Sequence, residues 1–424
     1  MESTEGKILK LKGKIQHYAW GGKEFIPRLL GMNNPKEEPF AEYWLGAHAS
    51  APAEVTNGST GPAGSYGQLN KLIELKKEKA LGEFVQKEFG RLPFLLKVLD
   101  VRDMLSIQVH PGKKAAEEAF ARENAAGLPV TSSNRNYRDD NHKPELLVAL
   151  SEFWLLHGFK SKDQLLKTFE SAPELGTLSR SFAGSNYESL YKEVMEMPQE
   201  KVNRILQPLI DHLIPLYKEK KLKKSSPDFW AARAALNYSD GKNIDRGIFS
   251  IYLLNLVHLQ KGEAVFQDAG ILHAYLEGQN VEIMANSDNV LRGGLTKKHI
   301  DVDELMKHVL FEPIEPLIIH AAEKLNGEEV YPTPSKDFEL SCFKLGPGEQ
   351  TEFVSETADI LFLLEGAVTL AETETYGKVR TDKSIEIGKG ESAVVLACHT
   401  HIKAMEDSIL FRATTPVKEK AIIA

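Results

Sequence analysis

Four residues in strand-like stretches of this sequence could together bind a metal ion. In SIQVHP (residues 106–111), Gln108 and His110 are separated by one residue, so on a strand both side chains point to the same face. Glu145 and His273 lie in two later strand-like stretches. Two imidazoles, a carboxylate and an amide oxygen suit zinc, with manganese or iron as other occupants. If these strands meet in the fold, the sequence predicts a metal site.

Each of these side chains also has a purely structural interpretation. A histidine within an apolar stretch is more often a hydrogen-bonded core residue than a ligand. Gln108 could cap the edge of a sheet, and Glu145 could pair with Lys143. His142 competes with His110 for the role of imidazole ligand. The spacing alone therefore leaves both interpretations open.

A polar, glycine-rich stretch, NSDNVLRGGLTKKH (residues 286–299), is the second group that could do chemistry. Its two consecutive glycines allow the backbone to approach a ligand closely. Arg292 could stabilise an oxyanion or bind a phosphate, and Lys297 and Lys298 could add positive charge. An exposed basic loop without a ligand is the alternative. The glycine-rich motifs of nucleotide-binding proteins are missing from the sequence, so a nucleotide cofactor is not indicated.

The elements that must hold these residues are mostly strands. Up to about residue 160, short β-like runs alternate with clusters of Gly, Pro and Asn, which is typical of an antiparallel barrel or jelly roll. One helix, over residues 113–127, is predicted to interrupt these runs. Strand-like sequence resumes at Gly247 and continues to the C-terminus, apart from a short helical break near residues 301–310.

Helical periodicity dominates between these two β-like regions, from Ser161 to about residue 245. Ser161 is followed three residues later by Gln164, a capping-box pattern that predicts the start of a helix. Apolar residues then recur at steps of three and four over residues 202–216, which predicts one buried stripe. Pro208 and Pro215 should kink or end that helix. The helical block is therefore predicted to be an insertion in a β-domain.

A weak internal repeat predicts two related jelly rolls. KGEAV (residues 261–265) resembles KGESAV (residues 389–394), and a histidine follows each glycine at the same distance, His273 in the first case and His401 in the second. Only the first copy has a partner strand like SIQVHP. We therefore expect the second roll to lack a metal, and the histidines of HTH (residues 399–401) to be surface residues.

The composition argues against several classes of protein. The 424 residues carry a formal net charge of -8 without a long basic stripe, which argues against nucleic acid as a partner. No apolar run is long enough to span a bilayer, and the N-terminus lacks a signal-peptide core. Two cysteines, Cys342 and Cys398, provide no disulfide framework. We expect a cytoplasmic protein of two or three domains that binds neither nucleic acid nor membranes.

The stretch YRDDNHKPE (residues 137–145) resembles the Y-x-D-x-N-H-K-P-E signature of the type I mannose-6-phosphate isomerases. Other blocks resemble that family in the same order: YAWG, AEYWLGAH, LPFLLKVLD, SIQVHPGK, GILHAYLEG and NSDNVLRGGLT. The resemblance covers nearly the whole chain. It implies a mainly β fold of two cupin-like jelly rolls with an α-helical insertion. Its parts would be a catalytic roll (residues 1–160 and 246–315), the helical insertion (161–245) and a C-terminal roll (316–424).

The resemblance also implies an aldose-ketose isomerase that interconverts mannose 6-phosphate and fructose 6-phosphate, with one zinc ion per chain. By motif match, the zinc ligands carry over to Gln108, His110, Glu145 and His273, and the catalytic arginine to Arg292. The partner would be a phosphorylated hexose, and we expect a monomer.

The chemistry of such a reaction agrees with these residue types. A proton must leave the carbon next to a carbonyl and return to the adjacent carbon through an enediolate, whose negative charge must be stabilised. Arg292 is permanently charged and suits that task. The candidates for proton transfer on matching segments are Glu282, Asp288, Lys143 and Tyr275. The expected contacts to the substrate phosphate are Ser106, Lys97 and Lys298.

Two other functions fit part of the pattern. Cupin-like sites with two histidines and a carboxylate also occur in iron dioxygenases, which would consume oxygen and depend on iron. A non-catalytic phosphosugar-binding protein would bind the sugar tightly without turnover.

Overall fold

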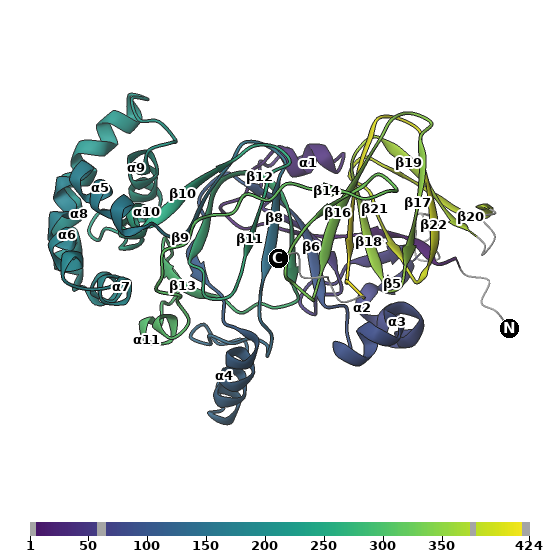
Figure 1. The fold of residues 1–424 in the computed structure, drawn as a ribbon, viewed down its shortest axis with the longest axis horizontal. Coiled ribbons are helices and arrows are strands. Elements are labelled where there is room, and N and C mark those ends of the chain that lie inside the picture. The colour runs from purple at the N-terminus through teal and green to yellow at the C-terminus, as the bar shows by residue number, and fades with distance from the viewer. Residues whose placement is uncertain (1–5, 57–64, 374–378, 418–424) are drawn as a thin grey trace.

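The computed structural model describes residues 6–56, 65–373 and 379–417. Three parts follow one another along the long axis of the molecule: a group of helices at one end, a central roll of strands, and a second roll of strands at the other end (Figure 1). The prediction of a mainly β fold with two jelly rolls and a helical insertion is confirmed.

The central roll is organised around β12 (His273–Ala285), which pairs with several other strands. These partners are β6 (Phe94–Val101), β7 (Ile107–Val109), β8 (Glu145–Ala149) and β9 (Phe153–Phe159). The same sheet also contains β2 (Lys14–Gln16), β3 (Glu42–Gly46), β10 (Leu254–Leu259), β11 (Ala264–Gln267) and β13 (Leu291–Gly294). Because so many strands meet along β12, residues far apart in the sequence come together inside this roll.

The second roll consists of two sheets that face each other. The larger contains β14 (Ala322–Glu323), β15 (Glu328–Tyr331), β16 (Glu339–Leu345), β23 (Ser408–Thr414), β18 (Asp359–Glu365) and β21 (Ser392–Val395). The smaller contains β17 (Gln350–Ser355), β22 (Cys398–Ala404), β19 (Ala367–Thr373) and β20 (Val379–Gly388). Apolar side chains such as Phe343, Leu361, Leu370 and Ile402 fill the interior of this roll. His401 lies on β22, and its Nε2 is 3.0 Å from Gln350 Oε1.

Three N-terminal strands complete the larger sheet of the second roll. They are β1 (Ile8–Lys12), β4 (Glu54–Thr56) and β5 (Ser65–Gln68), and β1 pairs directly with β21. The expected division placed residues 1–160 in the catalytic roll, whereas these three strands pair within the larger sheet of the second roll. Periodicity identifies a strand, whereas its partner is decided by the fold.

The helical part packs against one end of the central roll. It contains α5 (Lys162–Ser171), a short 3-10 helix (Pro173–Leu175), α6 (Gly176–Ala183), α7 (Tyr187–Glu196), α8 (Gln199–Lys218), α9 (Pro227–Tyr238) and α10 (Gly247–Leu253). The predicted capping box at Ser161 and Gln164 is confirmed. Of the two predicted effects of Pro208 and Pro215, a kink or an end of the helix, the second is not seen, because α8 continues through both prolines. Both prolines are exposed, about two turns apart, where water can satisfy the carbonyls that they leave without helical partners.

The structure corrects two further expectations about helices. Residues 247–253 form α10 rather than a strand, because every residue of α10 is buried and a helix that is apolar all round has no periodicity to distinguish it from a strand. The predicted helix at 113–127 is confirmed as α4 (Lys113–Ala125), but it is not alone in the N-terminal region. The additional helices are α1 (Phe25–Leu29), α2 (Leu69–Leu75) and α3 (Lys77–Glu88). The break predicted near 301–310 contains α11 (Val302–Met306).

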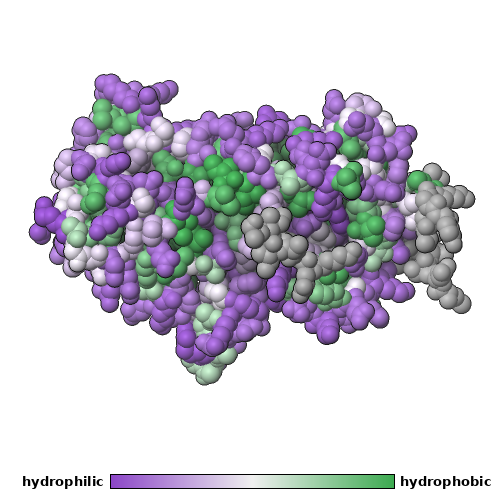
Figure 2. All heavy atoms as spheres, viewed as in Figure 1, coloured by the Kyte–Doolittle hydropathy of each residue, from purple (hydrophilic) through white to green (hydrophobic). Residues whose placement is uncertain are grey.

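The surface agrees with the charged composition. Figure 2 shows hydrophilic residues over most of the visible face, with hydrophobic residues gathered in smaller patches between them. Among the residues that the structure describes, none of the helices is both long and apolar enough to cross a membrane.

Candidate metal centre and active site

The strand β7 brings Gln108 between two other predicted site residues. In the antiparallel register, Gln108 lies opposite His273 of β12 on one side and opposite Arg292 of β13 on the other. Residues directly opposite each other in neighbouring strands place their side chains on the same face of the sheet. The strand pairing therefore collects an amide, an imidazole and a guanidinium on one wall of the roll.

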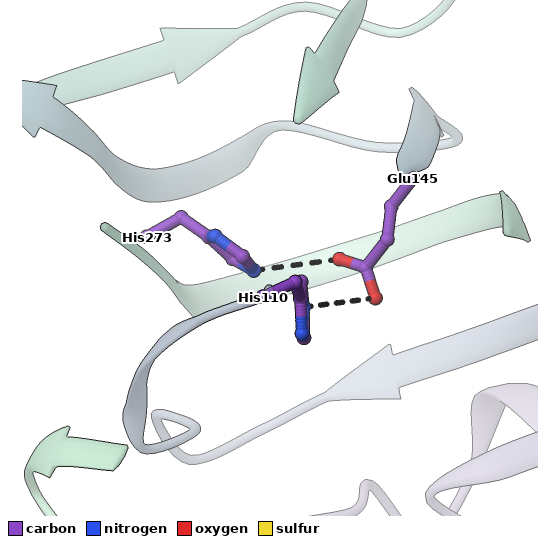
Figure 3. A group of neighbouring side chains, drawn as sticks. All are labelled: His110, Glu145 and His273. Atoms are coloured by element: carbon purple, nitrogen blue, oxygen red, sulfur yellow. Dashed lines mark ion pairs between the residues drawn. The ribbon is translucent and has the colours of Figure 1, made fainter. Parts of the chain in front are cut away.

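His110, Glu145 and His273 meet inside this roll. His110 follows β7, Glu145 begins β8 and His273 begins β12, and their side chains point toward one another (Figure 3). The Nε2 atom of His110 is 3.5 Å from Glu145 Oε1, and the Nε2 atom of His273 is 3.4 Å from Glu145 Oε2. One potential ligand atom from each residue lies within 4.8 Å of the others, and all three side chains are buried.

The protonation of these three residues fits a metal ion. His110 Nδ1 lies 2.8 Å from the Asn289 carbonyl oxygen, and His273 Nδ1 lies 2.9 Å from the Ile271 carbonyl oxygen. Each carbonyl accepts a hydrogen bond from Nδ1–H, so each Nε2 presents its lone pair to the centre of the group. Burial, assisted by the nearby Lys143 ammonium, lowers the pKa of His110 to about 4, which keeps that ring neutral.

The atoms that face the centre have no hydrogen-bond partner among the described residues. They are His110 Nε2, Glu145 Oε2 and His273 Nε2, and each is buried. Buried polar atoms are nearly always satisfied, and three electron-rich atoms directed at one point attract a cation. The residues present therefore fit a divalent metal ion, and their nitrogen and oxygen donors match zinc. The alternative imidazole, His142, contacts Asp337 with Nε2 2.9 Å from Oδ2 and stands outside this group.

A cavity of about 640 Å³ opens beside the three ligands. Most of the sequence-predicted site residues line it. They are Gln108, Glu145, Arg292, Glu282, Asp288, Lys143, Tyr275, Ser106, Lys97 and Lys298. Two tryptophans, Trp20 and Trp44, also line the cavity. The fold thus brings the predicted metal, catalytic and phosphate residues to one place.

A buried chain of acid and base groups lies on one wall of the cavity. Lys97 Nζ donates to Glu282 Oε1 at 3.0 Å, and Tyr275 donates its hydroxyl to Glu282 Oε2 at 2.7 Å. Burial raises the pKa of Glu282, although Lys97 opposes this shift. Burial and the neighbouring carboxylates raise the pKa of Tyr275, so its phenol stays protonated. This chain places a carboxylate of raised pKa against the cavity, where it can accept or return a proton.

Lys97 is not a free cation for a phosphate. Its ammonium lies 3.0 Å from Glu282 and 3.5 Å from Glu42. Burial alone would lower the pKa of Lys97, but these carboxylates outweigh it and raise that pKa. The structure therefore does not support the expectation that Lys97 meets the substrate phosphate. Glu42, which sequence analysis did not single out, lies in the AEYWLGAH block.

Positive charge gathers at another part of the cavity. Burial lowers the pKa values of Lys298 and Arg292, and Arg138 lowers both further. Like charges this close are unfavourable unless an anion joins them. No carboxylate of the described residues forms an ion pair with any of the three. Arg138 was not among the predicted site residues, although it is the second residue of the stretch YRDDNHKPE.

The other two proton-transfer candidates have different neighbours. Lys143 donates to Glu145 and so lies against a predicted metal ligand. Asp288 lies with Oδ1 3.5 Å from His48 Nε2, on a loop whose backbone N–H at Asp288 donates to Asp139 at 2.7 Å. Neither residue belongs to the chain that links Lys97, Glu282 and Tyr275.

The buried neutral histidines make the stability of the metal-free protein depend on pH. Burial lowers the pKa of His110 to about 4 and that of His157 to about 3. Between the unfolded pKa of about 6.5 and these values, the unfolded chain binds more protons than the folded one. We expect the free energy of unfolding to fall as the pH drops from about 6.5 toward 4, by up to about 1.4 kcal/mol per pH unit for each histidine.

Chemical denaturation of the metal-free protein at several pH values measures this dependence. A His157→Leu variant removes one of the two histidines and should give a shallower slope. An unfolding free energy that stays constant between pH 6.5 and 4.5 would contradict the assignment.

A jelly roll that directs His, His and Glu toward one point beside a polar cavity defines a metalloprotein of the cupin type. Residues 8–162 match the family profile described as phosphomannose isomerase type I, catalytic domain. The mannose-6-phosphate isomerase of Escherichia coli is 38% identical over 396 residues, which cover 92% of this chain and 97% of that protein. The human mannose-6-phosphate isomerase is 30% identical, with 96% and 98% covered. The chain belongs to the type I phosphomannose isomerase family.

Solved structures agree with this family. The mannose 6-phosphate isomerase of Salmonella typhimurium, solved with fructose 6-phosphate and zinc, superposes with a TM-score of 0.84 at 35% identity. The match covers 96% of this chain and 99% of that one. A zinc-bound mannose 6-phosphate isomerase superposes with a TM-score of 0.83 at 36% identity.

Proposed function

We propose that this chain is a zinc-dependent isomerase that interconverts mannose 6-phosphate and fructose 6-phosphate. The observation that carries the proposal is one cavity that joins a buried His, His and Glu group to a cluster of three cations. A metal ion in the same cavity as three cations suits a phosphorylated hexose. The curated relatives carry the name of this activity.

The metal would be held by Gln108, His110, Glu145 and His273. The first of these lies opposite His273 in the strand register and lines the cavity, so its amide oxygen can serve as a fourth ligand. When bound, zinc polarises the carbonyl of the open-chain sugar and orients its oxygens. We propose one ion per chain, because the described residues contain one such group.

Proton transfer is assigned to Glu282, with Lys97 and Tyr275 as its partners. Isomerisation moves a proton between two neighbouring carbons, and a carboxylate of raised pKa is suited to both removal and return. Lys97 and Tyr275 hold both oxygens of Glu282 in place. Arg292, on the strand next to Gln108, stabilises the negative charge of the enediolate.

The phosphate is assigned to Ser106, Arg138 and Lys298. All three line the same cavity, and one guanidinium group can donate two parallel hydrogen bonds to the oxygens of a phosphate.

An Arg138→Ala variant is expected to raise the KM for mannose 6-phosphate about tenfold while kcat changes less, because the lost contact is made both in the bound substrate and in the transition state. Steady-state kinetics tests this, with the exposed Arg91, outside the cavity, changed to Ala as the matched control. An unchanged KM would exclude Arg138 from the phosphate site.

A coupled assay tests the function itself. Fructose 6-phosphate is expected to form from mannose 6-phosphate, to stop forming after chelation, and to form again when zinc is restored. Binding of the sugar without turnover would support the non-catalytic phosphosugar-binding protein instead. Oxygen consumption that depends on iron would support a dioxygenase.

We also propose the location and oligomeric state of the enzyme: it is a cytoplasmic monomer, and neither nucleic acid nor a membrane is its partner. The net charge of -8 supports the first exclusion, and two free cysteines, Cys342 and Cys398, are compatible with a reducing compartment. Light scattering coupled to gel filtration would measure the mass, which is 47.3 kDa for one chain.

A further inference from the structure

One carboxylate in the helical part holds the backbone of the basic loop that sequence analysis singled out. Asp245 lies between α9 and α10. Its Oδ1 accepts hydrogen bonds from the backbone N–H groups of Gly247 at 2.7 Å and Leu295 at 2.9 Å. Its Oδ2 accepts one from the N–H of Thr296 at 3.2 Å. Asp245 thus connects the start of α10 to the residues just after β13.

The two segments touch backbone to backbone at this point. A Cβ atom on Gly294 would lie 2.4 Å from the Cα atom of Gly247, and a Cβ atom on Gly247 would lie 2.6 Å from the backbone nitrogen of Leu295. Only glycine allows so close an approach at both positions. The loop is therefore pressed against the helical part without room for a side chain between them.

The loop backbone also adopts conformations that need support. Gly294 has φ +134°, and Leu295 has φ +51°. The left-handed region is uncommon for a residue with a side chain and persists where the surroundings hold it. Since Asp245 accepts the N–H of Leu295 itself, its carboxylate is one such constraint.

This constraint reaches one cation of the cavity, Lys298, through Thr296. Thr296, whose N–H donates to Asp245, accepts with its Oγ1 a hydrogen bond from the backbone N–H of Lys298 at 3.1 Å. Arg292 lies on the other side of the Gly293–Gly294 pair. Both cations line the cavity, whereas Asp245 does not. Asp245 therefore contacts the loop and not the space that a substrate would occupy.

We propose that Asp245 is a positioning residue that sets the geometry of the phosphate end of the cavity, so that the helical insertion controls affinity for the phosphate group. The inference rests on the proposed function. Removing the carboxylate leaves three N–H groups without their acceptor and frees Leu295 to leave the left-handed region. Lys298 then loses its fixed position, while the metal ligands on β7, β8 and β12 keep theirs.

The test uses Asp245→Ala and the equal-sized Asp245→Asn in the zinc-loaded full chain. We expect the KM for mannose 6-phosphate and the dissociation constant of inorganic phosphate to rise about tenfold in Asp245→Ala, with a smaller rise in Asp245→Asn, which keeps one acceptor oxygen. We expect kcat to fall less than KM rises, and zinc content to stay at the wild-type level. Lys298→Ala should weaken phosphate binding in the wild type but add little in the Asp245→Ala background.

Asp240→Asn is the matched control. Asp240 precedes the same turn and accepts the backbone N–H groups of Lys242 and Asn243, but it makes no contact with the basic loop. This variant should keep the wild-type KM and phosphate affinity.

A purely structural role predicts a different result. If Asp245→Ala or Asp245→Asn lowers the melting temperature but leaves KM and phosphate affinity unchanged, the proposal is wrong, and loss of zinc would also overturn it. Calorimetric titration with inorganic phosphate does not require turnover. A wild-type chain without isomerase activity would therefore refute the proposed function, and the phosphate titration would still decide the role of Asp245.

Discussion

The His273→Ala variant is expected to lose both bound zinc and turnover. His273 supplies one of the two imidazoles in the buried group with Glu145, and its Nε2 faces Glu145 without a hydrogen-bond partner among the described residues. Removing a ligand from a buried site leaves too few donors to hold the ion against water or a chelator. The chemistry that the ion supplies is worth several kcal/mol, so kcat/KM should fall about a thousandfold or more. Metal analysis and the coupled assay on the same sample measure both effects.

A histidine of the second roll provides the control. His401 lies on β22, where its ring contacts Gln350, and it does not belong to the group of His110, Glu145 and His273. His401→Ala should keep the zinc content and activity of the wild type. If His273→Ala kept a full complement of zinc, or if demetallated wild-type enzyme remained fully active, the metal centre would be assigned wrongly.

The Arg292→Ala variant is expected to keep its zinc and lose turnover about a hundred- to a thousandfold. Arg292 lies opposite Gln108 on β13 and lines the cavity, but it is not among the buried His, His and Glu group. A preorganised positive charge beside a developing oxyanion is typically worth about 3 to 4 kcal/mol in a water-poor site. Its loss should therefore lower kcat while metal binding is unaffected.

Two further variants separate charge from geometry in this result. Arg292→Lys keeps the charge but loses the planar fork of donors, so we expect activity between that of Ala and wild type. Arg28→Ala, at an exposed position in the last turn of α1, should behave as the wild type. Full activity in Arg292→Ala would remove the arginine from the mechanism, whereas loss of zinc in that variant would show that its effect passes through the metal site.

The pattern of residue types identified candidate ligands, and the structure brings three of them together. Alternation along SIQVHP places Gln108 and His110 on one face, and the signature around Glu145 limits which carboxylate can join them. The structure groups His110 with Glu145 and His273. The choice between His110 and His142 could not be made by spacing, because the sequence separation of a histidine from Glu145 does not show which imidazole faces that carboxylate in the fold. It was decided by packing, which turns His142 toward Asp337 on the second roll.

Partners of charged residues were the least predictable feature. Lys97 could be expected to meet a phosphate as readily as a carboxylate, since an ammonium group binds both. Its neighbours Glu42 and Glu282 come from β3 and β12, the two strands that flank β6. Arg138 and Asp245 were not predicted for the same reason. The residues around each of them in the sequence do not indicate that Arg138 lines the cavity or that Asp245 binds the backbone of Leu295 and Thr296.

The sequence by itself determined the chemistry available to this protein and the direction in which each strand presents it. Residue type specifies the donor, and the period of two specifies the face. Only the tertiary structure decided which strands become neighbours: it placed β7 between β12 and β13, and moved β1 into the second roll. The physical reason is that hydrophobic periodicity indicates which face of a strand is buried. Which strands pair depends instead on the register and packing of segments that are distant along the chain.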